Sequence, residues 1–282
     1  MQSLGKWCAL GGNNWRARMR VLGGVEWRAR MRALGGVNWR ARMRVLGGAI
    51  LLLATGCAAP PLVVVSDLAN PPFATLEASG APRGFEVDLL QALADGLERP
   101  LEIRRQKFEE LLDTVASGQA DIACATLGVT PERAERVRFS RPYYQTGIAI
   151  VVRVNDPAAG GEIGALAGRR VAASRGTTSE RAVRLALPHV QGVYERKAET
   201  PYADMLRRGE VDAVVMDGPD AVRLATAEPA IFKIMTARLV EENYALALPL
   251  DRGELATQID RLLAELERSG RLDELRRKHG ID

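Results

Sequence analysis

Short apolar runs alternate with amphipathic segments from residue 62 to the end of the chain. Apolar runs bounded by turn residues are typical of buried strands, whereas apolar positions three and four residues apart indicate helices. The predicted strands are residues 62–66, 101–106, 121–127, 146–154, 169–174, 190–195, 211–217, 231–236 and 243–250. The predicted helices are residues 85–98, 108–118, 176–187, 199–210, 220–227, 253–270 and 272–280.

This alternation of strands and helices predicts an α/β fold with mainly parallel sheets flanked by helices. The elements fall into two sets of roughly 100 residues each, which is the size of a small domain. No flexible segment rich in Ser or Gly divides the two sets. We therefore expect two lobes that close on a shared cleft, rather than independent domains on a string.

Residues 1–56 differ in character from the rest of the chain and form a leader. Residues 13–48 hold three copies of a 12-residue unit, NNWRARMRVLGG, VEWRARMRALGG and VNWRARMRVLGG, which is too short a repeat for a solenoid. Its basic residues and Trp are compatible with an amphipathic segment on a membrane surface. We favour instead a start site placed upstream across a small DNA duplication, with Met43 as the natural start.

The segment MRVLGGAILLLATGC, residues 43–57, has the organisation of a secretory signal. Its apolar part is shorter than the ~20 residues that a membrane-spanning helix needs. The ending LATGC resembles the cleavage box of bacterial lipoproteins, which implies that the Cys57 thiol is joined to diacylglycerol. Residues 57–61 would then be a lipid-anchored tether, and the alternative is a plain secretory signal with Cys57 incidental.

The formal net charge of +4 comes from the leader, which has ten basic residues and one Glu. The remainder is mildly acidic and has few aromatic residues. A basic footprint for nucleic acid is therefore missing from the globular part of the sequence, and we expect no nucleic-acid partner.

The sequence contains no recognisable catalytic or metal-binding motif. Cys124 lies in an apolar run and has no partner cysteine for a disulfide once Cys57 is assigned to the anchor. His189 and His279 have no Cys, Asp or Glu at the spacing of metal ligands. A nucleophile elbow, a phosphate loop and a dinucleotide fingerprint are all absent, so we expect no cofactor, no metal and no enzymatic activity.

Polar residues at the ends of predicted strands are the candidate binding groups, because ligands of open α/β sheets bind beyond the carboxyl ends of strands. These residues are Thr126, Arg133, Thr177, Thr178 and Asp217. A guanidinium near a helix start suits a carboxylate, and a carboxylate suits an ammonium group. The set therefore predicts a site for a small zwitterion, with groups from both lobes closing on it.

A collinear series of segments resembles the bacterial extracellular solute-binding proteins, family 3. The most specific segment is GVTPERAERVRFSRPYY, residues 128–144. The others are FATLEASGAPRGFEVDLLQAL, RRVAASRGTTSE, GEVDAVVMDGPDA, NYALALPL and SGRLDELRRKHG. The resemblance covers about residues 62–280 and implies a two-lobed periplasmic-binding-protein fold.

The resemblance implies a lobe arrangement and a cellular role. The first lobe would comprise residues 62–151 plus 242–282, and the second lobe residues 152–241. The protein would be the amino-acid-binding component of an ABC importer, lipid-anchored in the periplasm or cell envelope. Its partners would be a small-molecule ligand and an ABC permease in the membrane, and we expect a monomer.

The resemblance also implies roles for individual residues. Arg133 matches the arginine that pairs with the ligand α-carboxylate, and Thr178 matches a second-lobe donor to the same group. Asp217 matches the acid that holds the α-ammonium group. Phe108 matches a wall of the side-chain pocket, and Asp67 lies at the pocket edge.

Three positions depart from the pattern of the family. Asn70 stands where an aromatic residue is common, and Ala74 stands where Glu is frequent. Gly128 stands where Ser or Thr is frequent, so the amide is kept and the hydroxyl is lost. We keep Asn70 and Gly128 among the expected site residues, and the departures leave open a polar ligand side chain or a ligand other than a standard amino acid.

Other interpretations of these residues remain open from the sequence. Arg133 could be a surface charge, Asp217 a helix N-cap and Phe108 a core residue. An alternative function on the same fold is a periplasmic cyclohexadienyl or arogenate dehydratase, which needs a general acid in the cleft. Glu77 and Asp67 are the nearest candidates for that acid.

Overall fold

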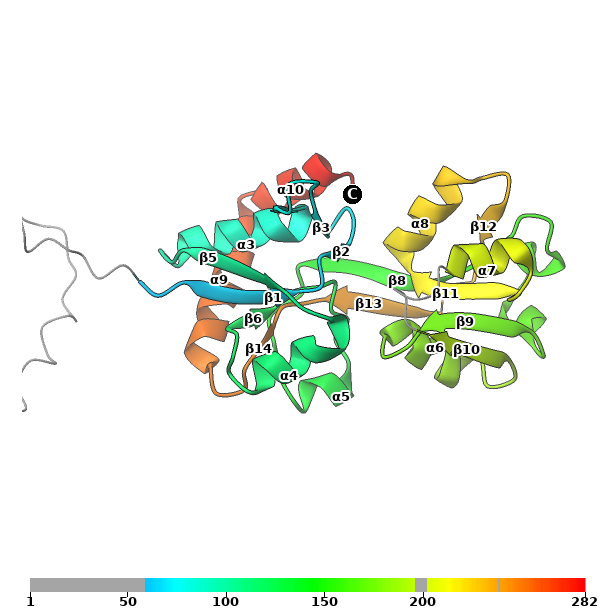
Figure 1. Cartoon of the computed structure of the whole chain (residues 1–282), viewed down its shortest axis with the longest axis horizontal. Coiled ribbons are helices and arrows are strands. Elements are labelled where there is room, and N and C mark those ends of the chain that lie inside the picture. The colour runs from blue at the N-terminus through cyan, green and yellow to red at the C-terminus, as the bar shows by residue number, and fades with distance from the viewer. Residues whose placement is uncertain (1–58, 196–201, 238, 282) are drawn as a thin grey trace, which may run out of the picture. The chain divides into compact units, whose positions relative to one another are not determined.

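The computed structural model describes residues 59–195, 202–237 and 239–281, which form two lobes with one main sheet each (Figure 1). The first sheet has the order β5-β1-β6-β14-β7. Its strands are β1 (Leu62–Ser66), β5 (Leu101–Arg105), β6 (Ile122–Ala123), β7 (Arg138–Phe139) and β14 (Ala247–Leu248). Strands β5, β1 and β6 are parallel, and β14 pairs antiparallel with both β6 and β7.

The second sheet has the order β10-β9-β11-β8-β12, and β13 also pairs with β8. Its strands are β8 (Tyr144–Arg153), β9 (Arg170–Ser174), β10 (Gln191–Glu195), β11 (Ala213–Asp217), β12 (Phe232–Ile234) and β13 (Val240–Tyr244). Strands β10, β9 and β11 are parallel, whereas β8 is antiparallel to its neighbours. A third, small sheet consists of β2 (Ala69–Asn70), β3 (Ala74–Leu76) and β4 (Pro82–Arg83).

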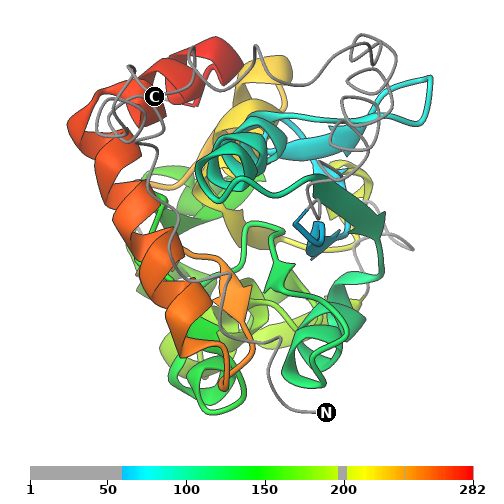
Figure 2. The ribbon, with the colours of Figure 1, turned by 90° about the vertical axis from the view of Figure 1, so that its left-hand side faces the viewer.

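Helices cover both faces of the first sheet. On one face α3 (Phe85–Gly96), α9 (Gly253–Arg268) and α10 (Arg271–His279) pack together, and Figure 2 shows α9 and α10 along one side of this lobe. Leu89, Leu93 and Ile259 lie in the core between these helices and the sheet. The other face holds α4 (Leu111–Ala116), preceded by the 3-10 helix η2 (Phe108–Glu110), and the short helix α5 (Pro131–Ala134).

The second sheet is covered in the same way. Helix α6 (Thr178–Ala186) packs on one face over a core that includes Val171 and Val215. Helices α7 (Tyr202–Arg208) and α8 (Gly218–Ala227) pack on the other face. Two 3-10 helices, η3 (Pro157–Gly160) and η4 (Ile163–Leu166), connect β8 to β9. The two-lobed α/β architecture agrees with the prediction from the alternating pattern.

Strands β8 and β13 form a two-stranded antiparallel ribbon that joins the lobes (Figure 1). At one end Tyr144 pairs with Tyr244, and both side chains pack with the first-lobe core. The predicted single strand 243–250 is therefore wrong, because the chain passes from β13 in the second sheet to β14 in the first. The predicted boundary at residues 151–152 falls inside β8, and the lobe boundaries stay a prediction.

The predicted strand 121–127 is also shorter than expected, since only Ile122–Ala123 pair in the sheet. The residues that follow are buried but leave the sheet and form the turn that leads to α5. The predictions for the leader and for Cys57 concern residues outside the described part of the chain.

A buried carboxyl group, that of Glu86 at the start of α3, holds this turn in place. Its side chain is 1% exposed, and Oε1 accepts hydrogen bonds from the Tyr143 hydroxyl and from the backbone N–H of Thr126 at 2.7 Å. Thr126 has a φ of 46°, a conformation that non-glycine residues seldom adopt without support. Burial raises the pKa of Glu86 to about 7, although the bonds from Tyr143 and Thr126 oppose the shift.

We expect the stability of the wild-type protein to fall as pH rises from 4.5 toward 7. In this window the unfolded chain releases the Glu86 proton while the folded protein keeps it, and a shift of this size corresponds to about 3 kcal/mol. Glu86→Gln should remove most of this contribution, which denaturant unfolding at several pH values would measure. The exposed Glu265→Gln serves as the control, and equal pH slopes for wild type and Glu86→Gln would contradict the assignment.

Candidate ligand-binding cleft

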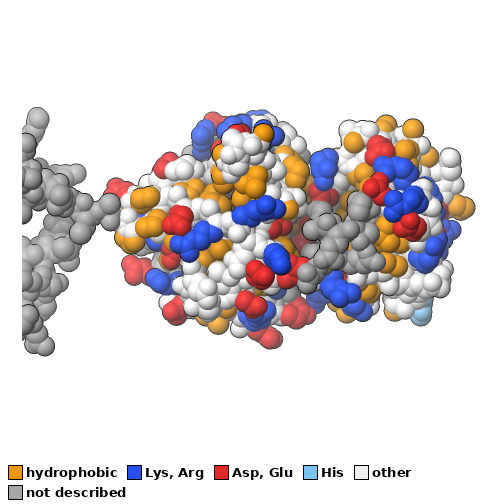
Figure 3. All heavy atoms as spheres, in the orientation of Figure 1, with side chains coloured by type: hydrophobic (Ala, Val, Ile, Leu, Met, Phe, Trp, Pro, Cys, Tyr) orange, Lys and Arg blue, Asp and Glu red, His pale blue; other side chains and the backbone are white. Residues whose placement is uncertain are grey.

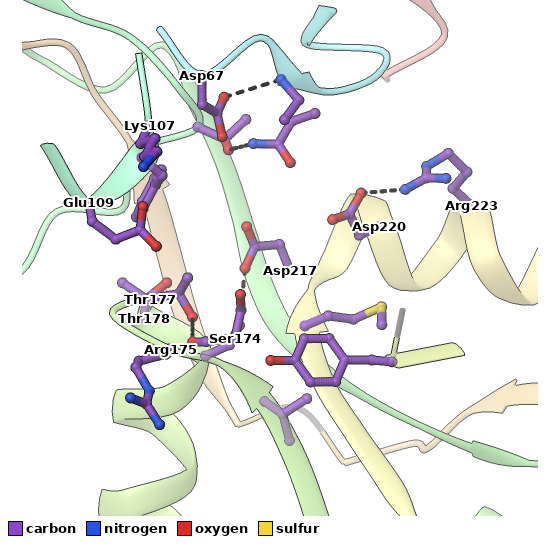
Figure 4. A pocket seen from close by; sticks show the side chains of 18 of the residues that line it. Asp67, Lys107, Glu109, Ser174, Arg175, Thr177, Thr178, Asp217, Asp220 and Arg223 are labelled. Carbon is purple, nitrogen blue, oxygen red and sulfur yellow. Dashed lines mark hydrogen bonds and ion pairs between the residues drawn. The ribbon is translucent and has the colours of Figure 1, made fainter. Parts of the chain in front are cut away.

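A cavity of about 1060 Å³ lies between the two lobes. It has walls from both sheets, and the side chains that line it are predominantly polar or charged. Figure 4 shows Asp67, Lys107 and Glu109 approaching from the first lobe and Ser174, Thr178 and Asp217 from the second. The carboxyl ends of β9 and β11 meet at this cavity, as expected for an α/β sheet.

Thr126, Asn70 and Asp67 form part of the first-lobe wall. The Asn70 side-chain amide donates a hydrogen bond of 3.1 Å to Oγ1 of Thr126. Because Glu86 already fixes the Thr126 backbone, the hydroxyl of Thr126 is held rigidly at the cavity. Asp67 Oδ1 accepts a hydrogen bond from the backbone of Ala69, which keeps this carboxylate close to the wall.

Arg133 lies at the junction of the lobes. It is in α5, whose first turn is capped by the Thr130 hydroxyl accepting from the Arg133 N–H. The guanidinium donates a hydrogen bond of 2.7 Å to the carbonyl of Gly128 in the first lobe. It donates a second hydrogen bond, of 3.1 Å, to the carbonyl of Gly176 in the second lobe. These two bonds orient a group with five N–H donors toward the cavity that it lines.

The charge of Arg133 is largely removed from water. Burial lowers the pKa of Arg133, and the negative charges of Glu242 and Asp217 oppose that shift. The guanidinium also lies 5.7 Å from the ring centre of Phe108, a cation–π contact. Arg133 is therefore not an ordinary surface charge, and Phe108 both lines the cavity and packs against the first-lobe core.

The N-terminus of α6 forms the facing part of the second-lobe wall. Thr177 is the N-cap, and its side chain accepts from the N–H of Glu180, as predicted for a capping residue. Thr178, the next residue, lines the cavity and is hydrogen-bonded through its hydroxyl to Oε1 of Glu242. The N-terminus of α6 carries the positive end of the helix dipole and unpaired backbone N–H groups, so it favours an anion beside Thr178.

Asp217 ends β11 and occupies the N-cap position of α8. Its side chain makes no capping hydrogen bond to that helix. Instead Oδ1 accepts a bond of 3.1 Å from the Ser179 hydroxyl of α6, and Figure 4 shows the carboxylate in the middle of the cavity. Asp217 therefore holds the N-cap position of α8, as the alternative interpretation expected, but its side chain faces the cavity and does not cap the helix.

Glu242, in β13, is a second carboxyl group at this junction and was not predicted from the sequence. It is 5% exposed, and its other oxygen, Oε2, has no hydrogen-bond partner among the described residues. Burial and the nearby charge of Asp217 raise the pKa of Glu242 to about 8, although the Thr178 bond and Arg133 oppose the shift. Near neutral pH this group is therefore mainly a neutral acid.

Most residues predicted for the site do line one cavity. They are Asp67, Asn70, Phe108, Thr126, Arg133, Thr177, Thr178 and Asp217. Gly128 is not on the cavity wall, but its carbonyl holds Arg133. Of the two acids considered for a dehydratase, Asp67 lines the cavity and Glu77 is exposed away from it.

The sequence analysis missed several residues of the wall. Ser174 ends β9 and could have been found by the strand-end rule that identified Asp217. Arg105 ends β5 and Lys107 lies two residues beyond it. Asp220 and Arg223, one turn apart in α8 and paired at 2.8 Å, had no signal beyond the polarity of the helix.

The described residues include no group of three or more His, Cys, Asp or Glu side chains that could hold a metal ion. Within the same part of the chain, no helix has the length and apolar character needed to cross a membrane. Figure 3 shows Lys and Arg interspersed with Asp and Glu on the face of both lobes that is in view.

Known proteins with similar sequences bind small solutes. The L-cystine-binding protein TcyJ of Escherichia coli (strain K12) is 27% identical over 220 residues, which is 77% of this chain and 81% of that protein. The structure of an ancestral arginine-binding protein bound to arginine is similar, with a TM-score of 0.70 and 30% identity over 78% of this chain and 97% of that one.

A second similar structure bears on the enzyme alternative. It is an ancestral amino acid-binding protein described as a precursor of cyclohexadienyl dehydratase, with a TM-score of 0.68 and 27% identity over 78% of this chain and 94% of that one. The matching protein itself is a binding protein, and the relatives above are binding proteins too. The model of one family matches residues 62–281. The chain therefore belongs to the bacterial extracellular solute-binding proteins, family 3.

Proposed function

We propose that the protein binds an amino acid in the cleft between its lobes and presents it to the permease of an ABC importer. The observation that supports this most directly is the placement of Arg133 and Asp217, from different lobes, on one cavity. A cation and an anion across one cleft complement the two charges of a zwitterion. Closure is then favoured by a ligand that contacts both lobes.

The ligand α-carboxylate is assigned to Arg133 and to the N-terminus of α6. Two N–H groups of Arg133 bond to backbone carbonyls and fix the guanidinium plane. The remaining donors can form a bidentate pair with a carboxylate. Thr178 adds its hydroxyl and its backbone N–H at the helix start, where an anion is stabilised.

The ligand α-ammonium group is assigned to Asp217. Its carboxylate accepts a hydrogen bond from Ser179 and lies in the middle of the cavity (Figure 4). Phe108 would flank the ligand side chain, while Asp67, Asn70 and Thr126 would contact its polar end. The mainly polar wall at that end favours an amino acid whose side chain has hydrogen-bonding groups.

The ribbon of β8 and β13 is proposed as the hinge, with a first lobe of residues 62–151 plus 242–282 and a second lobe of residues 152–241. Support comes from the pairing of Tyr144 with Tyr244 where the ribbon enters the first-lobe core. A single ribbon lets the lobes rotate without breaking either sheet. The protein is proposed to act as a monomer in the periplasm.

A lipid anchor at Cys57 is proposed to hold the protein at the membrane. The motif LATGC and the preceding apolar stretch are the support for this proposal. A short tether of residues 57–61 would then join the anchor to β1.

Arg133→Ala should weaken amino-acid binding at least about 100-fold, because it removes a bidentate charged contact. Isothermal titration of residues 58–282 against the twenty amino acids would first identify the ligand and then compare the variant with wild type. Arg138→Ala, an exposed arginine of β7, is the matched control and should bind like wild type. Wild-type affinity in Arg133→Ala would remove the assigned carboxylate site.

Asp217→Asn should also weaken binding about 100-fold while the thermal midpoint of the ligand-free protein changes little, since Asp217 caps no helix. Titration and thermal unfolding of the same sample measure both quantities. Asp251→Asn, in an exposed turn, is the control. A fall in the midpoint with unchanged affinity would instead indicate a structural role.

Cys57→Ser should release the protein from the membrane fraction of a bacterial host, because serine cannot form the thioether to diacylglycerol. Mass spectrometry of the wild-type N-terminal peptide should show the added acyl chains. Ala58→Ser, at the position next to Cys57, is the control and should leave the protein membrane-bound. An unmodified Cys57 in wild-type protein would refute the anchor.

A further inference from the structure

The pair formed by Thr178 and Glu242 has a consequence beyond the binding site itself. Thr178 is at the start of α6 in the second lobe, and Glu242 is in the ribbon strand β13. Their hydrogen bond joins a hydroxyl to a carboxyl oxygen, and either group can donate when the carboxyl is protonated. Only the hydroxyl can donate when the carboxyl is ionised.

The burial of Glu242 favours the neutral form. Oε1 faces Thr178, and Oε2 is buried without a hydrogen-bond partner among the described residues. An ionised carboxylate would leave half of its charge on an oxygen that no donor contacts, which is costly in a buried position. A neutral acid with its proton on the oxygen facing Thr178 leaves only a carbonyl oxygen unpaired.

The carboxyl group also fills a space that no other side chain can share. A Cβ atom on Gly128 would overlap Oε1 of Glu242 and would lie 2.8 Å from Cγ2 of Thr178. The glycine is therefore required for the Glu242 carboxyl to reach Thr178 between the lobes. The sequence alone showed only that a hydroxyl was missing at position 128.

The charged and titratable groups around Glu242 come from three elements. Arg133 of α5 is the neighbouring cation, Asp217 at the end of β11 is the neighbouring anion, and Tyr244 follows in β13 itself. Burial and the charges of Asp217 and Glu242 raise the pKa of Tyr244 well above its usual value, so it stays neutral. The charge of Asp217 raises the pKa of Glu242, and the charge of Arg133 opposes that shift.

We propose that Glu242, as a neutral acid, donates its proton to Oγ1 of Thr178, so that the Thr178 hydroxyl is free to donate to the ligand carboxylate. Glu242 is thus a positioning residue that sets which way the Thr178 hydrogen points. Ionised Glu242 would take the Thr178 hydrogen for itself and turn the lone pairs of Oγ1 toward the ligand carboxylate. Binding of the amino acid therefore requires a proton on Glu242, and this inference depends on the proposed carboxylate site.

The sign of the pH dependence follows from this arrangement. The bound carboxylate stabilises neutral Glu242, so binding takes up protons near pH 8 and affinity falls as Glu242 ionises. If Glu242 instead served mainly the ligand ammonium group, its ionised form would bind better and affinity would rise with pH. The two roles therefore predict opposite slopes.

The test uses residues 58–282 and the amino acid with the lowest Kd in the titrations described above. For wild type, Kd should increase about fourfold between about pH 6.5 and 8.5, as expected for loss of one proton from a group with the Glu242 pKa. Glu242→Gln can always donate to Thr178 through its amide and should bind with a nearly constant Kd. Because both proteins meet the same ligand, titration of the ligand ammonium group cancels in the comparison.

Two further measurements separate this role from a structural one. Titration of wild type near pH 8 in buffers of different ionisation enthalpy should show proton uptake on binding, and Glu242→Gln should show much less. Thr178→Val removes the hydroxyl, so it should bind more weakly at every pH and should lose the pH dependence even though Glu242 is retained.

The outcomes distinguish the role of Glu242 from the proposed amino-acid-binding function. Binding in which wild type and Glu242→Gln have superimposable pH profiles, or an affinity that rises with pH, overturns the role of Glu242 and leaves the proposed function intact. Failure of every amino acid to bind wild type at any pH overturns the proposed function and this inference with it.

Discussion

The partly buried guanidinium of Arg133 is the group on which the arrangement of the cleft depends. A cation removed from water needs anions or carbonyl dipoles nearby, and Arg133 has both. Its carbonyl partners, Gly128 and Gly176, belong to different lobes, so the cation is satisfied only where the lobes approach each other. The same contacts orient its remaining donors toward the cavity.

The carboxyl groups near Arg133 have different roles because their surroundings differ. Asp217 lines the open cavity and accepts a hydrogen bond from the Ser179 hydroxyl, which contacts it from α6. Glu242 is buried behind the wall and has one oxygen without a partner, which favours a neutral form. One arginine therefore faces one carboxylate and one acid, and the cleft stays close to electrically neutral before a zwitterion enters.

Local signals were enough to predict much of the fold and part of the site. Strand ends identified Arg133, Thr178 and Asp217, because the carboxyl ends of parallel strands meet at the same edge of a sheet. The periodicity of residues 243–250 could not show that the chain leaves one sheet for another, since residues 244–248 are apolar without a break. Glu242 gave no signal because its hydrogen-bond partner, Thr178, is 64 positions away in the sequence.

The dependence of Glu242 on Gly128 explains why its role could not be inferred from either residue alone. A glycine in a turn usually indicates a need for backbone freedom. Gly128 is needed here because it has no side chain, which leaves room for the Glu242 carboxyl group from β13. A hydroxyl at position 128 and a carboxyl at position 242 would compete for the same volume beside Thr178. A chain that uses the carboxyl acquires a group that can gain or lose a proton near neutral pH, whereas a hydroxyl cannot. Glycine at position 128 therefore allows a titratable carboxyl group to lie at the anion-binding end of the cleft.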